Sequence, residues 1–326
     1  MQTLLGSVWP IPWLVRRRAG TLLARSRERL LDCGEGVRLQ AFISAALKPT
    51  RRVALLLHGW EGSSEATYIL SLGSLLLQHG YEVVRVNLRD HGATHHLNRE
   101  IFHSCRLPEV VGAVAAIART YPQARLYLAG FSLGGNFLLR VAADERSPAQ
   151  IAGVVAVSPV LDPEATLSAL ERGWRIYRRS FVRRWSRSLR RKQRSWQGVH
   201  DFRDLLRLGQ LRGMTAGLVL RCTDFPDLAA YLNGYAITGP RLATLRFPAR
   251  VLLAEDDPIV PAADLKRLAA SPLLVVERSR YGGHCGFADS LSGPSWADRY
   301  VLDQFEQFDS STALTGARAD LESARG

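Results

Sequence analysis

Short apolar runs recur along the chain and predict the strands of one sheet. The run V-A-L-L-L at 53–57 is apolar at every position, which is typical of a strand buried on both faces of a parallel sheet. Further strand-like runs follow at 81–88, 125–129, 151–158, 250–254 and 273–277. We therefore expect a sheet whose strands are mostly parallel and buried.

Helix-like segments separate these runs. They lie at 66–78, 108–119, 136–143, 262–270 and 296–308. Strands that alternate with helices predict right-handed β-α-β units, with helices on both faces of the sheet. The alternating stretches within 30–46, turned at Gly34 and Gly36, predict an antiparallel pair in front of this pattern.

The alternation stops between about 161 and 246, which indicates an insertion between two strands. Asp162 and Pro163 form a good helix start, with a capping carboxylate and a proline in the first turn. The residues after them repeat at intervals of three and four and predict one long helix with an apolar face, formed by Leu167, Leu170, Trp174, Tyr177, Phe181, Trp185 and Leu189. Its other face is almost entirely arginine. This helix either caps the core or also contacts an anionic membrane surface.

These patterns divide the chain into four parts. Residues 1–27 form a basic and apolar N-terminal segment, residues 28–160 and 247–308 form the core, and residues 161–246 form an arginine-rich helical cap. Residues 309–326 are small, polar and unpatterned, and we expect a disordered tail there.

Charge is concentrated in the insertion. The net charge of the 326 residues is +13, and the stretch 172–212 alone contains 14 Lys and Arg but only two Asp. The four cysteines are scattered without a C-x-x-C pair, which argues against a zinc site and favours a reducing compartment. The N-terminus lacks the order of a signal peptide, and no run is long enough to span a bilayer. We expect a cytoplasmic protein, with contact at the inner membrane face as the further option.

The segment G-F-S-L-G-G-N at 130–136 joins a predicted strand to a predicted helix. This order is typical of a nucleophile elbow, in which Ser132 sits on a strained turn above the sheet edge. Side chains at positions 130 and 134 would collide with the neighbouring strand and helix, and Gly135 permits close packing. The alternative is an ordinary glycine-rich turn.

A serine nucleophile requires a base, and the base requires a carboxylate. His284 lies in R-Y-G-G-H-C-G-F, between the last strand and the last helix, where it can reach the carboxyl edge of the sheet. The segment E-D-D-P ends a strand and offers Asp257 as the preferred acid, because Pro258 follows it, with Asp256 second. The chain order serine, acid, histidine is the order of the α/β-hydrolases.

The oxyanion of such a reaction needs two backbone N–H donors. We expect one from Leu133, directly after the serine, and one from Trp60 in H-G-W-E-G-S-S. Trp60 could instead form only a pocket wall. Asp90, His91, Asn98 and His103 follow another strand at the same edge, and either order their loop or line the pocket.

Five segments together resemble the YheT-like branch of the α/β-hydrolase superfamily. They are H-G-W-E-G-S-S-E, N-L-R-D-H-G-A-T-H-H-L-N, G-F-S-L-G-G-N, E-D-D-P and Y-G-G-H-C-G-F, in order between about 53 and 305. The resemblance implies an α/β-hydrolase fold with an inserted cap, and hydrolysis of carboxylic esters, including acyl lipids in some relatives. The arginine-rich helix departs from that pattern.

We therefore expect a serine esterase or lipase that needs no metal or organic cofactor and acts on a small-molecule or lipid ester. Two alternatives stay open. One is a catalytically weak hydrolase fold whose basic cap binds anionic lipid or, less favoured, nucleic acid. The other is an acyltransferase or thioesterase with the same three side chains.

Overall fold

A computed structural model describes the backbone of residues 11–289 and 293–323, and side chains as far as residue 310. Within these residues the sheet has eight strands in the order β1-β2-β4-β3-β5-β6-β7-β8. The strands are β1 (Ser26–Asp32), β2 (Arg38–Ser44), β3 (Arg52–Leu57), β4 (Glu82–Val86), β5 (Arg125–Phe131), β6 (Ile151–Val157), β7 (Ala249–Ala254) and β8 (Leu274–Ser279). β1 and β2 pair antiparallel with each other, β2 pairs antiparallel with β4, and the other pairings are parallel. The predicted, mostly parallel sheet and its antiparallel first pair are both confirmed.

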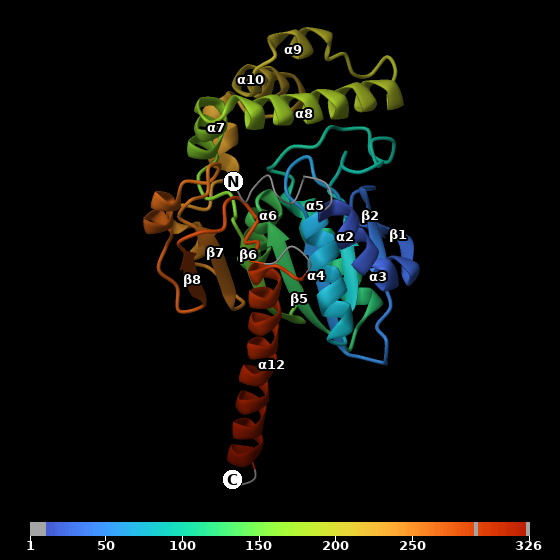
Figure 1. Cartoon of the computed structure of the whole chain (residues 1–326), viewed down its shortest axis with the longest axis vertical. Coiled ribbons are helices and arrows are strands. Elements are labelled where there is room, and N and C mark those ends of the chain that lie inside the picture. The colour runs from blue at the N-terminus through green and yellow to red at the C-terminus, as the bar shows by residue number, and fades with distance from the viewer. Residues whose placement is uncertain (1–10, 290–292, 324–326) are drawn as a thin grey trace.

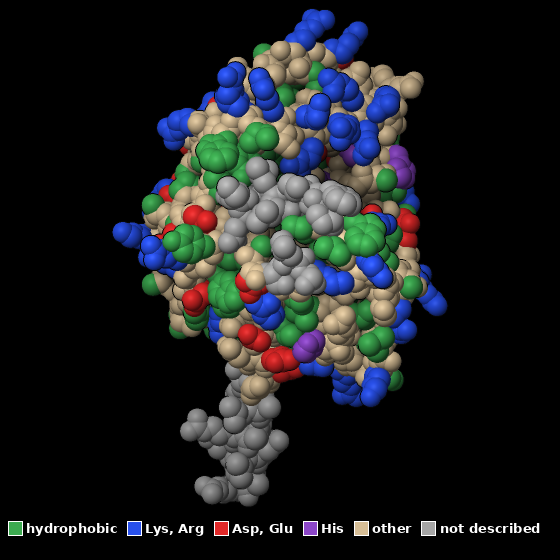
Figure 2. Space-filling model, in the orientation of Figure 1, with side chains coloured by type: hydrophobic (Ala, Val, Ile, Leu, Met, Phe, Trp, Pro, Cys, Tyr) green, Lys and Arg blue, Asp and Glu red, His purple; other side chains and the backbone are tan. Residues whose placement is uncertain are grey.

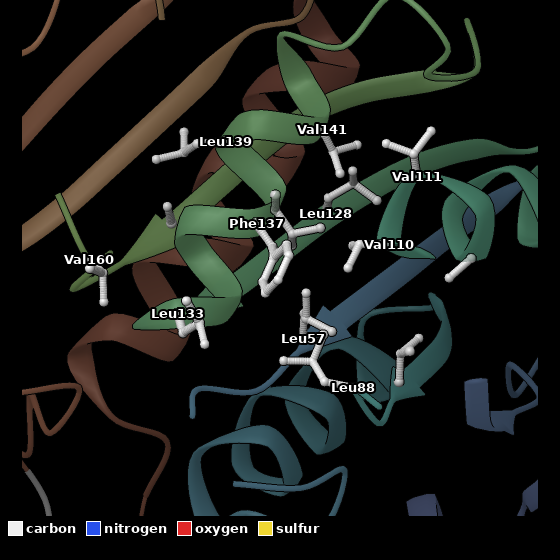
Figure 3. Packing of buried hydrophobic residues seen from close by; sticks show 14 of the residues in the cluster. Leu57, Leu88, Val110, Val111, Leu128, Leu133, Phe137, Leu139, Val141 and Val160 are labelled. Carbon is white, nitrogen blue, oxygen red and sulfur yellow. The ribbon is translucent and has the colours of Figure 1, made fainter. Parts of the chain in front are cut away.

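Alternate residues of each central strand face two separate hydrophobic cores. In β3, Leu55 and Leu57 belong to one core, whereas Ala54 and Leu56 belong to the other. This follows from the two-residue period of a strand, and it explains why the run is apolar throughout. Figure 3 shows the first core at α6, where Phe137 and other side chains of the helix meet Leu57 and Leu128 of the sheet.

Helices cover both faces of the sheet, as predicted. α5 (Leu107–Thr120) and α6 (Leu133–Ala142) pack on the first core, and α4 (Thr67–Gln78) and α12 (Trp296–Ser323) pack on the second. The short helices α2 (Ile11–Arg18) and α3 (Gly20–Ala24) lie against α4. Figure 1 shows these layers, with the cap above them.

The cap lies between β6 and β7. It contains α7 (Pro163–Arg172), α8 (Arg175–Ser195), α9 (Arg203–Leu208), α10 (Leu211–Cys222), α11 (Leu228–Tyr235) and the 3₁₀ turn η1 (Pro240–Leu242). The predicted start is confirmed, since Asp162 Oδ1 accepts from the N–H groups of Glu164 and Ala165 at 2.9 and 3.1 Å.

The prediction of one continuous helix through the cap is wrong. α7 ends at Arg172 and α8 begins at Arg175, with Gly173 in an extended conformation between them. A Cβ at position 173 would lie 2.7 Å from the carbonyl oxygen of Ala169, so glycine is required for this close turn. The apolar residues keep their intervals of three and four across the break between the two helices. Periodicity alone therefore could not reveal the break.

Two further predictions about the last third of the chain need correction. Residues 309–323 of the predicted tail form the end of helix α12 instead, and residues 324–326 lie outside the described part of the chain. The alanines, the leucines, Arg318 and Glu322 of this segment are good helix formers. The prediction ended the helix where the apolar pattern stops, and it did not take helix propensity into account. The segment 262–270 forms a 3₁₀ helix, η2 (Ala262–Arg267), rather than an α-helix.

A buried ion pair joins cap helix α8 to the core. Lys192 Nζ lies 2.9 Å from Asp90 Oδ1, and the two side chains are 1% and 4% exposed. Nζ also donates to the carbonyl oxygens of Asn98 and Glu100. Burial raises the pKa of Asp90 and lowers that of Lys192. The ion pair and the hydrogen bonds together therefore compensate for the cost of burying the two charges.

We expect Lys192→Met to lower the free energy of unfolding by about 3–5 kcal/mol, because it leaves the buried Asp90 carboxylate without a counter-charge. Urea titration followed by circular dichroism measures this change. Arg190→Met alters an exposed arginine of the same helix and should change the free energy by less than about 0.5 kcal/mol. Equal losses in the two variants would contradict the role of the buried pair.

Candidate active site

Ser132 occupies the sharp turn between β5 and α6. Its φ of 52° and ψ of −119° lie outside the regions that non-glycine residues favour, and such strain costs about 1–3 kcal/mol. A Cβ on Gly130 would lie 2.5 Å from the carbonyl oxygen of Gly134, and one on Gly134 would lie 2.4 Å from that of Leu57. The predicted steric need for both glycines is confirmed.

The structure brings Ser132 and His284 together across 152 positions of sequence. Ser132 Oγ lies 2.9 Å from His284 Nε2, which is the distance of a hydrogen bond. Only a tenth of the His284 side chain is exposed. The imidazole can therefore accept the serine proton without rearrangement.

The two adjacent acids have different partners. Asp257 Oδ2 lies 2.9 Å from His284 Nδ1, and its Oδ1 accepts from the N–H groups of Ile259 and Val260. Asp256 Oδ1 instead accepts from the N–H groups of Gly282 and Gly283 at 2.8 and 2.7 Å. The preferred acid thus contacts the histidine, and the second candidate holds the loop that carries it.

The surroundings of His284 favour its charged form. Burial of the ring opposes the charge, but the Asp257 carboxylate and its hydrogen bond stabilise it, and Cys285 contributes in the same direction. The net result is a pKa of His284 well above its usual value. The ring therefore binds a proton readily when the serine loses one.

The two backbone N–H groups expected to bind the oxyanion belong to Leu133, directly after Ser132, and to Trp60, directly after Gly59. Among the described residues, neither Leu133 N–H nor Trp60 N–H has a hydrogen-bond acceptor. Leu133 is the first residue of α6, where the helix dipole adds positive potential. The turn before Trp60 approaches the serine closely, since a Cβ on Gly59 would lie 3.0 Å from Ser132 Cβ.

Trp60 is also a wall of the pocket, so the two interpretations of this residue are compatible. Its ring stacks on Phe181 at 5.6 Å and meets Trp185 edge-on at 5.3 Å. Both partners belong to α8. The cap therefore contacts the same turn that presents the backbone N–H.

Buried side chains that the sequence analysis missed anchor this turn. Arg85, in β4, donates to the carbonyl oxygen of Ser64, and Asn87 Oδ1 accepts from Ser64 N–H at 2.7 Å. His58 Nδ1 donates to the Gly59 carbonyl, while its Nε2 accepts from Leu88 N–H. Burial lowers the pKa of His58 to about 3, so the ring stays neutral. The sequence signal that could have revealed this anchor was Arg85, a charged residue among the apolar residues of a strand.

A cavity of about 930 Å³ opens above Ser132 and His284. Its apolar wall beneath the cap includes Val160, Leu167, Leu170, Leu218 and Leu232. Its polar lining includes Glu61, Arg184, Arg187 and Arg191. The cavity can therefore hold a molecule with apolar and polar parts next to the serine hydroxyl.

The loop after β4 both orders itself and lines the cavity. Asp90 Oδ2 accepts from Phe102 N–H at 2.8 Å, and Asn98 bonds both backbone groups of Arg38. Asp90, His91 and His103 line the cavity. Both alternatives offered for this loop therefore apply, and Asp90 meets both of them.

None of the helices described in the structure combines the length and apolar character that crossing a bilayer requires.

Comparisons with known proteins agree with this architecture. The profile of a family described as alpha/beta hydrolase fold matches residues 53–291. The solved structure of the esterase Pf2001 from Pyrococcus furiosus superposes with a TM-score of 0.59 at 15% identity, covering 87% of this chain and 90% of that one. The predicted fold class is confirmed.

Several curated relatives have names that describe an esterase or a lipase. The chain is 26% identical over 263 residues to the putative esterase YheT of Escherichia coli, which covers 76% of this chain and 75% of the relative. It is 22% identical over 325 residues to mouse phospholipase ABHD3, covering 92% of this chain and 77% of that protein. The predicted YheT-like resemblance is confirmed, and these relatives support hydrolase activity.

Proposed function

Because the chain belongs to the α/β-hydrolase fold family, we propose that it cleaves a carboxylic ester by a serine mechanism. The observation that carries this proposal is the continuous pair of contacts from Ser132 Oγ to His284 and from His284 to Asp257, each 2.9 Å long. Nucleophile, base and orienting acid in this geometry are the elements of acyl transfer.

Acylation begins when Ser132 Oγ attacks the ester carbonyl carbon and His284 Nε2 takes the hydroxyl proton. The carbonyl π pair moves to its oxygen, and the N–H groups of Trp60 and Leu133 hydrogen-bond that oxyanion. Asp257 stabilises the imidazolium and keeps the ring oriented. When the carbonyl re-forms, the alcohol leaves with the proton from His284.

Deacylation repeats these steps with water. His284, neutral again, takes a proton from water as the water oxygen attacks the acyl carbon. The second tetrahedral intermediate collapses, Ser132 Oγ regains its proton from His284, and the carboxylic acid is released.

The apolar residues of the cavity lining support an acyl chain as the non-polar part of the substrate. In a p-nitrophenyl ester series from acetyl to dodecanoyl, we expect kcat/KM to rise at first by about fourfold per methylene, since each buried methylene contributes about 0.8 kcal/mol. Leu167→Trp should abolish this rise for the longer chains and spare the acetyl ester.

The control for this substitution is Leu220→Trp, which changes an exposed residue of the same cap outside the cavity lining. It should behave as the native protein throughout the series. No turnover of any ester by the native protein would contradict the proposed function.

We expect kcat/KM to fall as the pH drops, with a midpoint above 6.5. His284 must be neutral to accept the serine proton, and its raised pKa keeps it protonated, and inactive, up to that higher pH. The cavity histidines His91, His95 and His103 cannot produce this midpoint, because burial lowers their pKa values to about 4, 4 and 3. The pH dependence of kcat/KM for the acetyl ester measures this midpoint.

Glu61 is a second cavity group that titrates near this range, since burial raises its pKa to about 7. The matched control is therefore Glu61→Gln. The acid limb should remain in this variant at its native position, whereas a loss of the limb would assign it to Glu61 instead of His284.

A further inference from the structure

One face of cap helix α8 carries arginines without counter-charges. We call Arg175, Arg179, Arg183, Arg187, Arg190 and Arg194 the arginine face; all six are exposed. In the part of the chain that the structure describes, none of the six forms an ion pair with a carboxylate. Figure 2 shows basic side chains gathered over the cap.

Other arginines of the cap are neutralised within the protein. Arg203 pairs with Asp201, Arg212 with Glu164, and Arg221 with Asp204. The six residues of the arginine face have no such partner among the described residues, and neither has Arg207 of α9. An uncompensated row of charge of this kind is suited to an anionic partner.

Large apolar side chains are exposed next to this charge. Trp174 and Ile176, at the start of α8, are 68% and 57% exposed. Trp13 of α2 is 53% exposed, and Arg17 lies over its ring. Tryptophan and arginine side by side at a surface are typical of segments that lie in a membrane interface.

This apolar surface adjoins the cavity above Ser132. Ile176 itself lines the cavity, and so do Ile11 and Val15 from the helix that bears Trp13. Arg187 of the arginine face is also part of the cavity rim. The charged face, the exposed apolar side chains and the opening above Ser132 are thus continuous.

From this continuity we propose that the arginine face, Trp174, Ile176 and Trp13 dock the protein on an anionic lipid bilayer, so that a lipid ester passes from the bilayer into the cavity. The proposal rests on the proposed function. The arginines neutralise lipid phosphates, and the apolar side chains enter the headgroup layer.

A nucleic acid fits this surface less well. Base stacking requires exposed aromatic faces between the basic groups. Trp185 is only 8% exposed and packs on Trp60, and Trp196 is half-buried with its indole N–H bonded to the carbonyl oxygen of His95. Two of the three tryptophans at or along α8 are thus engaged inside the protein, and Trp174 is the exposed one.

Vesicle flotation of the full chain tests the proposal. The native protein and Ser132→Ala are mixed with vesicles of phosphatidylcholine alone, or with about one third phosphatidylglycerol, at about 50 and about 500 mM NaCl. We expect both proteins to float with the anionic vesicles at low salt and to be released at high salt. Failure of the native protein to float at low salt would overturn the proposal.

Two matched triple variants test the surface itself. Replacing Arg179, Arg183 and Arg190 by Gln should weaken binding about 100-fold, since each arginine near an anionic surface contributes about fivefold. The control replaces the exposed Arg27, Arg29 and Arg51, which lie on β1 and before β3, and should bind as the native protein does. Equal weakening in both would overturn the proposal, because net charge alone would then explain binding.

Further measurements separate apolar docking, nucleic acid binding and catalysis. Trp174→Ser should weaken flotation, and full flotation of this variant would overturn the apolar contribution. Tighter binding of single-stranded RNA than of anionic vesicles would also overturn the proposal.

The triple variant at 179, 183 and 190 should hydrolyse dissolved p-nitrophenyl acetate at the native rate. Flotation without ester hydrolysis would overturn the proposed function alone, whereas hydrolysis without flotation would overturn only the docking.

Discussion

Replacing Ser132 by alanine is expected to reduce kcat for ester hydrolysis by at least about 10⁴-fold and to abolish labelling by a fluorophosphonate probe. The substitution removes the hydroxyl oxygen that lies 2.9 Å from His284 Nε2. Loss of the nucleophile from such a group of side chains costs about 10⁶-fold in the best-studied case, and oxyanion binding leaves a small residue of activity. Stopped assays and gel fluorescence measure the two effects.

Ser180→Ala is the control for that experiment. Ser180 lines the same cavity, but its hydroxyl accepts a hydrogen bond from Arg184 and has no contact with the histidine. Labelling and turnover should stay near native levels in this variant. Persistent labelling of Ser132→Ala would remove the serine from its proposed role and with it the serine mechanism.

Asp257→Asn is expected to lower kcat by about 10⁴-fold while the fold is preserved. The amide keeps the shape of the carboxylate, but its NH₂ group can face His284 Nδ1, which favours the wrong tautomer and leaves the imidazolium without a counter-charge. The pKa of His284 should fall as well, because the Asp257 carboxylate is the main group that raises it. The acid limb of the remaining activity should therefore move to lower pH.

Asp256→Asn provides a comparison at the neighbouring position. Asp256 only accepts hydrogen bonds from Gly282 and Gly283, and the carbonyl oxygen of asparagine can accept them too. We expect less than about a tenfold loss, with the acid limb at its native pH. If Asp256→Asn were the more damaging change, the assignment of the acid would be wrong.

The break between α7 and α8 and the buried pair of Lys192 and Asp90 are two features that the sequence pattern could not predict. Periodicity correctly predicted that Tyr177 and Trp185 face inward, but its placement of Trp174 on the same face is wrong, because Trp174 precedes the start of α8 and is 68% exposed. It could not show that Gly173 interrupts the helix or that Lys192 turns inward to meet Asp90. Lysines of this kind are nearly always exposed, so only the contact itself identifies the exception.

The sequence alone determined the parallel sheet, the elbow at Ser132 and the order of serine, acid and histidine along the chain. These features depend on residue type and on near neighbours, such as apolar runs at successive positions and glycines on either side of one serine. Only the tertiary structure decided that Asp257 rather than Asp256 meets His284. It also decided that the ring of Trp60 forms a wall of the pocket, and that Arg85 and Asn87 anchor the turn in which Trp60 lies. The physical reason is that adjacent residues at a strand end point in different directions, and the direction that meets a partner is set by packing between segments far apart in the chain.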